Sequence, residues 1–268
     1  MESLEERMKA IRERAGLTST GGWSIEDRAA AYNSRRGELT GYDCQKCRNK
    51  GHVMILQDGC EYMVECDCMD IRRSIQRIAN SGLADVLEQY RLDNFTAETG
   101  HHRAMKDMAE DFLQTDTGWL FIGGQVGAGK THICTAVCAE LMKQGKSVRY
   151  IIWPEEVTRL KAIKMKEEEY AVAMNELKRF DVLYIDDFCK KQAGVLPTSA
   201  DVDIAFELIN SLYLQNSKRV IFSSERTVRE ITEEIDQGLG SRIYQKCDNH
   251  NMTISTDMGK NYRLHKED

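Results

Sequence analysis

The chain has 268 residues, enough for one large α/β domain or for one domain and a smaller module. A hydrophobic content of 41% and a charged content of 30% exclude an intrinsically disordered chain, and a net charge of -6 excludes a surface that is basic throughout. No apolar stretch reaches the roughly 20 residues that cross a bilayer, and the N-terminus lacks an apolar secretory segment. We therefore expect a cytoplasmic protein without a membrane partner.

Residues 1–41 are predicted to be an N-terminal helical segment. Short helices are expected over 2–15 and 24–36, and the sequence GLTSTGG between them is typical of a flexible joint. Ser24 followed by Asp27 indicates a capping box at the start of the second helix.

Residues 42–94 are predicted to be a cysteine-rich module with its connecting helices, in which short strands and turns surround the cysteines. Cys44 and Cys47 form a C-x-x-C pair, and Cys66 and Cys68 form a C-x-C pair. Thiolates at this spacing close a tetrahedral Zn²⁺ site, and the metal then organises a module too small to have its own core. The sequence therefore predicts a zinc site made by these four cysteines.

Other interpretations of this module stay open. His52 and Cys60 are spare ligands, and either could replace one of the four cysteines. The cysteines could also be reduced, unligated thiols, since disulfides are not expected in a reducing compartment. A redox C-x-x-C usually sits at a helix start in a βαβ unit, and this pair does not.

Helices are expected over 70–82 and 83–90, and the domain boundary lies near 91–99. In the remaining domain, 95–268, strands alternate with helices. The strands are predicted over 118–124, 147–153, 180–188, 218–225 and 251–257, and the helices over 130–145, 155–179 and 201–216. This alternation predicts an α/β fold, with a mainly parallel five-stranded sheet and helices on both faces.

The sequence GQVGAGKT fits the phosphate-binding pattern G-x-x-x-x-G-K-[ST] between a predicted strand and a predicted helix. Its glycines let successive N–H groups point at phosphate oxygens, and the helix N-terminus adds partial positive charge. Lys130 is expected to neutralise the β- and γ-phosphates of ATP, and the Thr131 hydroxyl to bind Mg²⁺. The predicted nucleotide contacts are Gly124, Gln125, Val126, Gly127, Ala128, Gly129, Lys130, Thr131 and His132.

Acidic residues follow a hydrophobic strand in VLYIDDF, which places Asp186 and Asp187 at its end. The carboxyl ends of parallel strands share one edge of a sheet, so both residues should lie beside the phosphate loop. Asp186 is expected to hold Mg²⁺, directly or through water, and Asp187 to orient or deprotonate the attacking water. Ser224 and Glu225, after the next predicted strand, are candidates for sensing the γ-phosphate, although such residues also end strands without a function.

An arginine is needed to offset charge on a transferring phosphoryl group. Arg242, which follows a glycine pair before the last predicted strand, is a candidate finger acting on the nucleotide of a neighbouring subunit. Arg263, in GKNYR, is a second candidate. The alternative for each is a solvated surface arginine.

These motifs together resemble the DnaC/DnaI-type replicative helicase loaders, which are ATPases of the AAA+ class. Their order is C-x-x-C, C-x-C and SGL, then GWLFIGGQVGAGKTH, VLYIDDF, VIFSSER, SRI and a terminal GKNYRL. The versions with an N-terminal cysteine module, from Gram-positive bacteria, their phages and mobile elements, are the most similar. The resemblance is strong over 118–268, good over 42–83 and weak over 1–40.

The resemblance gives each candidate residue a role. The roles are Walker A loop for Gly124 to Thr131, Walker B for Asp186 and Asp187, sensor for Ser224 and Glu225, arginine finger for Arg242 and second sensor for Arg263. Asp187 stands where many AAA+ proteins carry Glu, which implies slow, switch-like hydrolysis, and Glu225 stands where such a sensor often carries Asn or Asp. The helical lid of larger AAA+ proteins is not expected.

The same resemblance implies partners. Residues 1–90 would hold a hexameric replicative helicase, the ATPase domain would self-associate, and single-stranded DNA would bind in the region of 155–179. The basic residues predicted to contact DNA phosphates there are Arg159, Lys161, Lys164 and Lys166. Glutamates are interspersed with them, so a solvated helix of ion pairs fits equally well.

The resulting hypothesis is an ATP-dependent loader of a replicative DNA helicase onto single-stranded DNA during replication initiation, using ATP, Mg²⁺ and Zn²⁺. A transposition-helper ATPase of the IstB type shares the motor but generally lacks the cysteine module. A nucleoside or small-molecule kinase would need an acceptor pocket and an arginine-bearing lid, and neither is evident. A zinc-dependent adaptor whose ATP site does not turn over is a third alternative.

Overall fold

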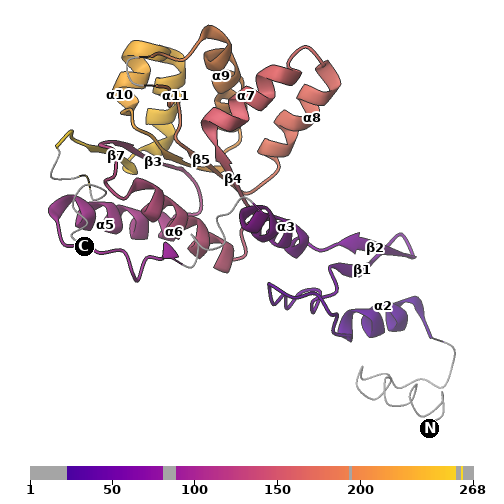
Figure 1. Cartoon of the computed structure of the whole chain (residues 1–268). Coiled ribbons are helices and arrows are strands. Elements are labelled where there is room, and N and C mark those ends of the chain that lie inside the picture. The colour runs from indigo at the N-terminus through magenta and orange to yellow at the C-terminus, as the bar shows by residue number, and fades with distance from the viewer. Residues whose placement is uncertain (1–22, 81–88, 193–194, 258–260, 262–268) are drawn as a thin grey trace. The chain divides into compact units, whose positions relative to one another are not determined.

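The chain forms two compact units, 1–75 and 76–268 (Figure 1). Each unit has its own hydrophobic core. The computed structural model describes residues 23–80, 89–192, 195–257 and 261. The helix predicted over 2–15 and Arg263 lie outside the described residues, as does most of the helix predicted over 83–90. Within the described part of the chain, no helix is long and apolar enough to cross a membrane.

The first described helix of the N-terminal unit, α2 (Ile25–Ser34), begins as predicted. The Ser24 hydroxyl accepts a hydrogen bond from the Asp27 amide, and the Asp27 carboxylate accepts one from the Ser24 amide, each at 3.1 Å. This capping box satisfies amides that have no partner inside the helix, which is why the helix starts here.

A β-hairpin and a further helix follow in the described residues. Strands β1 (His52–Gln57) and β2 (Cys60–Glu65) pair antiparallel. Asp58 and Gly59 join them, both with positive φ, as a type I′ turn requires. Helix α3 (Cys68–Asn80) then starts at the last of the clustered cysteines.

The second unit is built on a five-stranded parallel sheet with the strand order β4-β5-β6-β3-β7. The bounds are β3 (Trp119–Gly124), β4 (Val148–Ile152), β5 (Val182–Asp186), β6 (Arg219–Ser223) and β7 (Asn251–Ile254). The central strands β5 and β6 are buried along their whole length, which explains their continuous apolar sequences. The predicted five-stranded α/β fold is confirmed.

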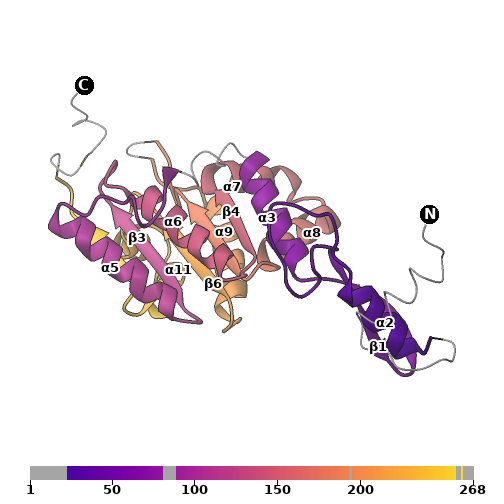
Figure 2. The same ribbon diagram turned by 90° about the horizontal axis from the view of Figure 1, so that it is seen from below.

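Helices cover both faces of the sheet. Helices α5 and α6 pack together on one face, and α7, α8, α9 and α11 lie on the other (Figures 1 and 2). The bounds are α5 (Gly100–Gln114), α6 (Lys130–Lys143), α7 (Trp153–Ile163), α8 (Glu167–Lys178), α9 (Ser199–Tyr213) and α11 (Gln237–Cys247). Trp119, Phe121 and Phe222 belong to the core between the sheet and the second group of helices.

The prediction of one helix over 155–179 is wrong, because α7 and α8 are separate helices joined by a turn at 164–166. Each helix has its own start signal: Pro154 lies in the first turn of α7, and three glutamates occupy the first turn of α8. The turn lets Leu160 of α7 and Leu177 of α8 enter the same core.

Two helical regions lie where no element is predicted. In α5, the spacing of the fully buried Met105, Ala109 and Phe112 is helical, so this helix has a signal in the sequence. Between β6 and β7 lie the short helix α10 (Val228–Glu230), the π-helical turn η1 (Ile231–Ile235) and α11. Arg242 therefore lies on a helix that the sequence analysis does not predict.

Candidate functional site

The phosphate loop joins β3 to α6 and needs glycine at defined positions. Gly124, Gly127 and Gly129 have φ values of 103°, 73° and 85°, in the left-handed region that other residues rarely adopt. A Cβ atom at Gly124 would lie 2.0 Å from the carbonyl oxygen of Ile254 in β7. The loop backbone therefore turns as a phosphate cradle requires, and the neighbouring strand leaves no room for a side chain.

Lys130 starts α6 and is buried within the turn. Its Nζ donates to the carbonyl oxygens of Gly124 at 2.8 Å and Gln125 at 2.6 Å. Burial lowers the pKa of Lys130, while the charges of Glu225 and the nearby acids oppose that shift. The N-terminal N–H groups of α6 lie beside this ammonium, so the loop offers both kinds of group that hold phosphate.

Asp186, at the end of β5, lies beside the phosphate loop, as expected from the shared edge of the sheet. Its carboxylate accepts hydrogen bonds from Thr131 Oγ1 at 3.3 Å, from the Tyr150 hydroxyl at 3.0 Å and from the Ser223 hydroxyl. Burial and the charge of Asp186 raise the pKa of Tyr150, so its hydroxyl remains a donor. The spacing of the Thr131 and Asp186 oxygens fits two adjacent Mg²⁺ ligands, which lie about 3 Å apart in an octahedral site.

Asp187 also faces the phosphate loop. Its carboxylate forms an ion pair with Lys190, a residue that belongs to no sequence motif. Lys190 Nζ lies 3.0 Å from Asp187 Oδ2 and 2.9 Å from Glu225 Oε1. Burial opposes the charge of Lys190, but hydrogen bonds to Glu225 and Asp187 raise its pKa. The side chain is therefore a cation at neutral pH, shared between two carboxylates.

These elements surround one cavity of about 490 Å³. Its lining residues include Val126, Gly127, Ala128, Gly129, Lys130, Thr131, His132, Asp186, Asp187, Lys190, Ser223 and Glu225. The phosphate loop, the strand-end acids and Lys190 thus meet at one place. The volume is in the range of cavities that hold small-molecule ligands.

Aromatic side chains form another part of the cavity wall. Tyr90 and His132 stack with ring centroids 4.5 Å apart, and Phe95 meets His132 edge to face at 5.1 Å. Burial lowers the pKa of His132 and, together with the neighbouring His101, lowers that of His102 to about 4. Both lining histidines are therefore neutral at pH 7, and this part of the wall suits a flat, uncharged ring. Tyr90 and Phe95 lie before the first predicted strand, where no motif marks them.

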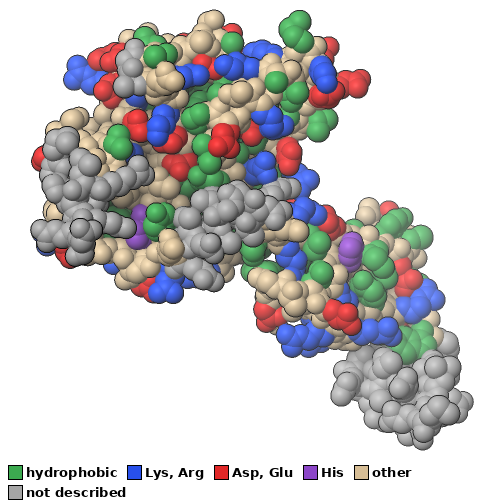
Figure 3. Space-filling view, in the orientation of Figure 1, with side chains coloured by type: hydrophobic (Ala, Val, Ile, Leu, Met, Phe, Trp, Pro, Cys, Tyr) green, Lys and Arg blue, Asp and Glu red, His purple; other side chains and the backbone are tan. Residues whose placement is uncertain are grey.

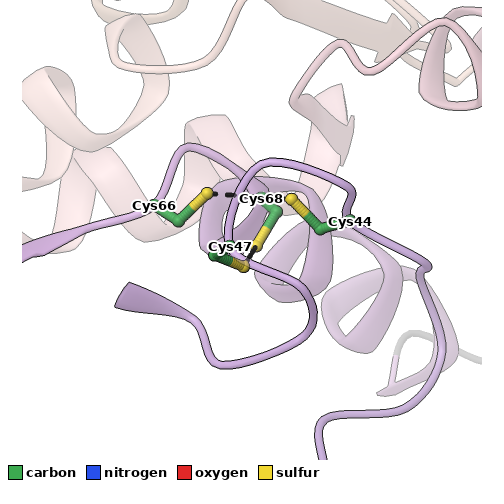
Figure 4. Close-up of side chains that lie close together, drawn as sticks. All are labelled: Cys44, Cys47, Cys66 and Cys68. Carbon is green, nitrogen blue, oxygen red and sulfur yellow. Dashed lines mark hydrogen bonds between the residues drawn. The ribbon is translucent and has the colours of Figure 1, made fainter. Parts of the chain in front are cut away.

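The four predicted zinc ligands lie together in the N-terminal unit (Figure 4). The Sγ atoms of Cys44 and Cys66 are 3.8 Å apart, those of Cys47 and Cys68 are 3.4 Å apart, and all four lie within 4.8 Å of one another. Four thiolates on a tetrahedral Zn²⁺ are about 3.8 Å apart, since each Zn–S bond is about 2.3 Å. The residues therefore fit this metal.

The surroundings of the thiols also fit a structural metal site. Asn49, itself buried, accepts a hydrogen bond from the Cys44 amide at 2.8 Å, and Arg72 donates to the same Asn49 oxygen at 2.9 Å. Second contacts of this kind fix ligand geometry. Cys60 is exposed on the hairpin, and neither it nor His52 belongs to the cluster. The fourfold cysteine set is therefore complete without the spare ligands.

The comparisons with known proteins agree with this geometry. A family model of the bacterial DnaA ATPase domain matches residues 87–247, more than half of the chain. The phage-like element PBSX protein XkdC of Bacillus subtilis (strain 168) is 31% identical over 229 residues, which cover 80% of this chain and 82% of XkdC. The chain belongs to the family of the bacterial DnaA ATPase domain.

Solved structures support the same fold. The DnaC helicase loader matches with a TM-score of 0.52 and 18% identity over 64% of this chain and 98% of that chain. AMPPCP-bound DnaA from Aquifex aeolicus matches with a TM-score of 0.51 and 24% identity over 65% of this chain, which spans about half of DnaA (52%). The predicted AAA+ fold of the DnaC/DnaI type is confirmed.

In this DnaA-family domain, two candidate residues have other partners in the domain. Ser224 is buried: its hydroxyl donates to the Phe188 carbonyl at 2.7 Å, and its carbonyl accepts from the Gly124 amide of the phosphate loop at 3.2 Å. Its contact with nucleotide stays a prediction. Arg242 on α11 donates to Asn210 Oδ1 at 3.0 Å, and its guanidinium lies 4.8 Å from the centre of the Phe206 ring.

The four basic residues predicted to contact DNA have partners inside the domain. Arg159 pairs with Glu156 at 2.5 Å, Lys166 with Glu169 at 3.0 Å and Lys161 with the buried Asp201 at 2.7 Å, while Lys164 lies 5.7 Å from the centre of the Tyr170 ring. Basic and acidic side chains are interspersed on the face drawn in Figure 3. These contacts favour the alternative, in which the basic side chains form ion pairs on the helices.

We expect charge reversal at Lys161 to act on stability rather than on DNA binding. Burial alone would raise the pKa of Asp201, but hydrogen bonds from Lys161 and Lys191 hold it well below its usual range. Lys161→Glu should therefore lower the free energy of unfolding by about 2 to 3 kcal/mol, because a buried carboxylate loses one of its two cations. Lys166→Glu, whose pair is exposed, should change it by less than about 0.5 kcal/mol.

Urea denaturation of both variants checks this prediction, with single-strand affinity measured beside it. The contribution of Asp201 should be complete above the usual Asp pKa of about 3.9 and should be lost as the pH falls below it, because the folded pKa is lowered. An unchanged stability of Lys161→Glu with weakened DNA binding would contradict the structural role.

Proposed function

We propose that this protein is an ATP-dependent loader of a replicative DNA helicase onto single-stranded DNA. The observation that carries the proposal is a four-thiol unit followed in the same chain by an ATPase domain with the fold of the DnaC helicase loader. XkdC, which is similar over most of the chain, is a protein of a phage-like element. The cysteine unit distinguishes this arrangement from a transposition helper of the IstB type.

The residues that line the cavity support ATP as the substrate. The loop amides and Lys130 would hold the β- and γ-phosphates, and the aromatic wall of Tyr90, Phe95 and His132 would face the adenine ring. Thr131 and Asp186 would hold Mg²⁺, which supplies positive charge to the phosphates. A solved DnaA structure of the same fold carries AMPPCP, an ATP analogue.

The placement of Asp187 at the same cavity supports hydrolysis of ATP. Asp187 would orient the attacking water and accept its proton. The water oxygen forms a bond to the γ-phosphorus while the bond from that phosphorus to the bridging oxygen breaks, giving ADP and phosphate. ATP and ADP would then favour different conformations, so turnover releases the loader from its partner.

The remaining roles belong to assembly. Residues 1–90, with zinc held by the four cysteines, would grip the hexameric helicase, and the ATPase domain would bind other copies of itself and single-stranded DNA. A solved DnaA of this fold binds single-stranded DNA. Arg242 would leave Asn210 and reach the nucleotide of a neighbouring copy.

A second function is favoured by one contact. The Lys190 ammonium lies 3.0 Å from Asp187 Oδ2 and occupies a carboxylate oxygen that would hold the water, which suits an adaptor whose ATP site turns over very slowly. Steady-state phosphate release by the wild type and by Asp187→Asn separates the two functions. A loader loses turnover in the variant, whereas for the adaptor both proteins release phosphate at the background rate.

Affinity capture tests the loader itself. The full chain, held on a resin with ATP and Mg²⁺, should recover a hexameric replicative helicase from a bacterial lysate. The matched control is the chain with Cys66→Ser and Cys68→Ser, which keeps the ATPase domain and should recover none. Recovery of a transposase in place of a helicase would overturn the proposal.

A further inference from the structure

Lys190 lies in the cavity wall between two carboxylates that belong to different strand ends. Its Nζ is 3.0 Å from Asp187, which follows β5, and 2.9 Å from Glu225, which follows β6. Lys130, the lysine of the phosphate loop, lines the same cavity. The site therefore contains two ammonium groups, and the role of the second one is unassigned.

The backbone directs Lys190 toward the cavity. Asp187 and Cys189 have φ values of 54° and 58°, left-handed conformations that residues with a side chain rarely adopt. The Lys190 amide donates to the Asp187 carbonyl at 3.0 Å, which closes the turn, and the Phe188 amide donates to Ser223 of β6 at 3.0 Å. Strained turns that a packed core holds in place concentrate at functional sites.

Lys190 can exchange its carboxylate partners for a phosphate group. Its side chain is 37% exposed, and those of Asp187 and Glu225 are 36% and 32% exposed, so water screens both pairs and each contributes little. A γ-phosphate carries more negative charge than one carboxylate and offers several acceptor oxygens, so it is the stronger partner for an ammonium group. ADP has no such group.

We propose that Lys190 is a nucleotide-discriminating residue, which bridges Asp187 and Glu225 when no γ-phosphate is present and binds the γ-phosphate of ATP. This inference rests on the proposed ATPase function and deepens it. When the Lys190 side chain moves from Asp187 to the γ-phosphate, the Asp187 carboxylate is free to orient the water. Binding of the γ-phosphate would therefore activate the residue that hydrolyses it. Glu225 competes with the phosphate for Lys190 and draws it back after phosphate leaves.

The affinities of the full chain for ATP and ADP, measured by calorimetry with Mg²⁺, test this role. Lys190→Met should lower the preference for ATP over ADP by at least about tenfold, because a charge-assisted contact to the γ-phosphate is lost. Lys190→Arg keeps the cation and should retain the preference to within about threefold. The thermal midpoint of each variant shows that the fold is intact, as expected for a partly exposed side chain.

A double-mutant cycle separates contact from general charge effects. Glu225→Gln should raise the preference for ATP more in the wild-type background than in the Lys190→Met background, since its effect through Lys190 adds to its effect on Lys130. Equal effects in both backgrounds would overturn the inference, as would a Lys190→Met protein whose preference stays within about twofold of the wild type. If the wild-type chain bound neither nucleotide, the proposed function itself would fail and the inference with it.

Discussion

Replacing Cys66 and Cys68 together by serine is expected to unfold the described part of the N-terminal unit and to leave the ATPase domain folded. The four clustered thiols and Val53 are the buried residues of this small core, whereas the ATPase domain has an extensive core of its own. Zinc binding to such a module supplies about 10 kcal/mol or more of folding free energy, and two thiolates do not retain the metal. Hydrogen exchange should show loss of protection over β1 and β2.

The zinc content of the protein and a control variant test whether the metal holds this unit folded. The wild type should carry one zinc per chain, as a single four-thiolate site requires. Cys60→Ser, which removes an exposed thiol of the same hairpin outside the cluster, should keep both the metal and the exchange protection. A Cys66→Ser and Cys68→Ser chain that still protects its hairpin would show that the module folds without zinc.

Lys130→Met is expected to abolish turnover and to weaken ATP binding by about a hundredfold or more. The buried ammonium is held at the loop by the carbonyls of Gly124 and Gln125, so it is positioned for the phosphates before they arrive. Methionine keeps the length and packing of the side chain but not the charge. Titration of a fluorescent ATP analogue and steady-state phosphate release measure the two effects.

The control for this variant lies on the same helix. Lys143→Met removes an exposed lysine at the end of α6, where the pair with Glu140 contributes little, and should keep affinity and turnover within about twofold of the wild type. A Lys130→Met protein with nearly normal ATP affinity would contradict the assignment of the loop as the nucleotide site.

Short-range patterns carried most of what the sequence predicted correctly. The phosphate loop, the strand before it and the helix after it are encoded within a few consecutive residues, because glycine is needed at the positive-φ positions. The convergence of Thr131 and Asp186 followed from one rule, that parallel strands end at a common edge, and a 3.3 Å contact confirms it. The spacing of the cysteines likewise brought four thiols together.

The sequence is less informative where a residue's partner lies far away in the chain. Helical periodicity over 155–179 is continuous, and only packing of both halves into one core explains the turn between α7 and α8. Lys161 is indistinguishable in sequence from a DNA-binding lysine, yet it neutralises Asp201 of another helix. Ser224 follows its strand like a sensor, but its hydroxyl points to the Phe188 carbonyl.

The parallel sheet, the phosphate loop, the acids at the strand ends and the thiol cluster could all be predicted from the sequence. These features depend on backbone requirements and ligand spacings within short stretches of the chain. Only the tertiary structure brought Lys161 to Asp201 and Lys190 to Glu225, which are distant from each other in the chain. Asp187 is only three residues from Lys190, but Glu225 reaches the same lysine because β5 and β6 pair in register. Charge pairing depends on distance in space, and distance in the chain does not report it.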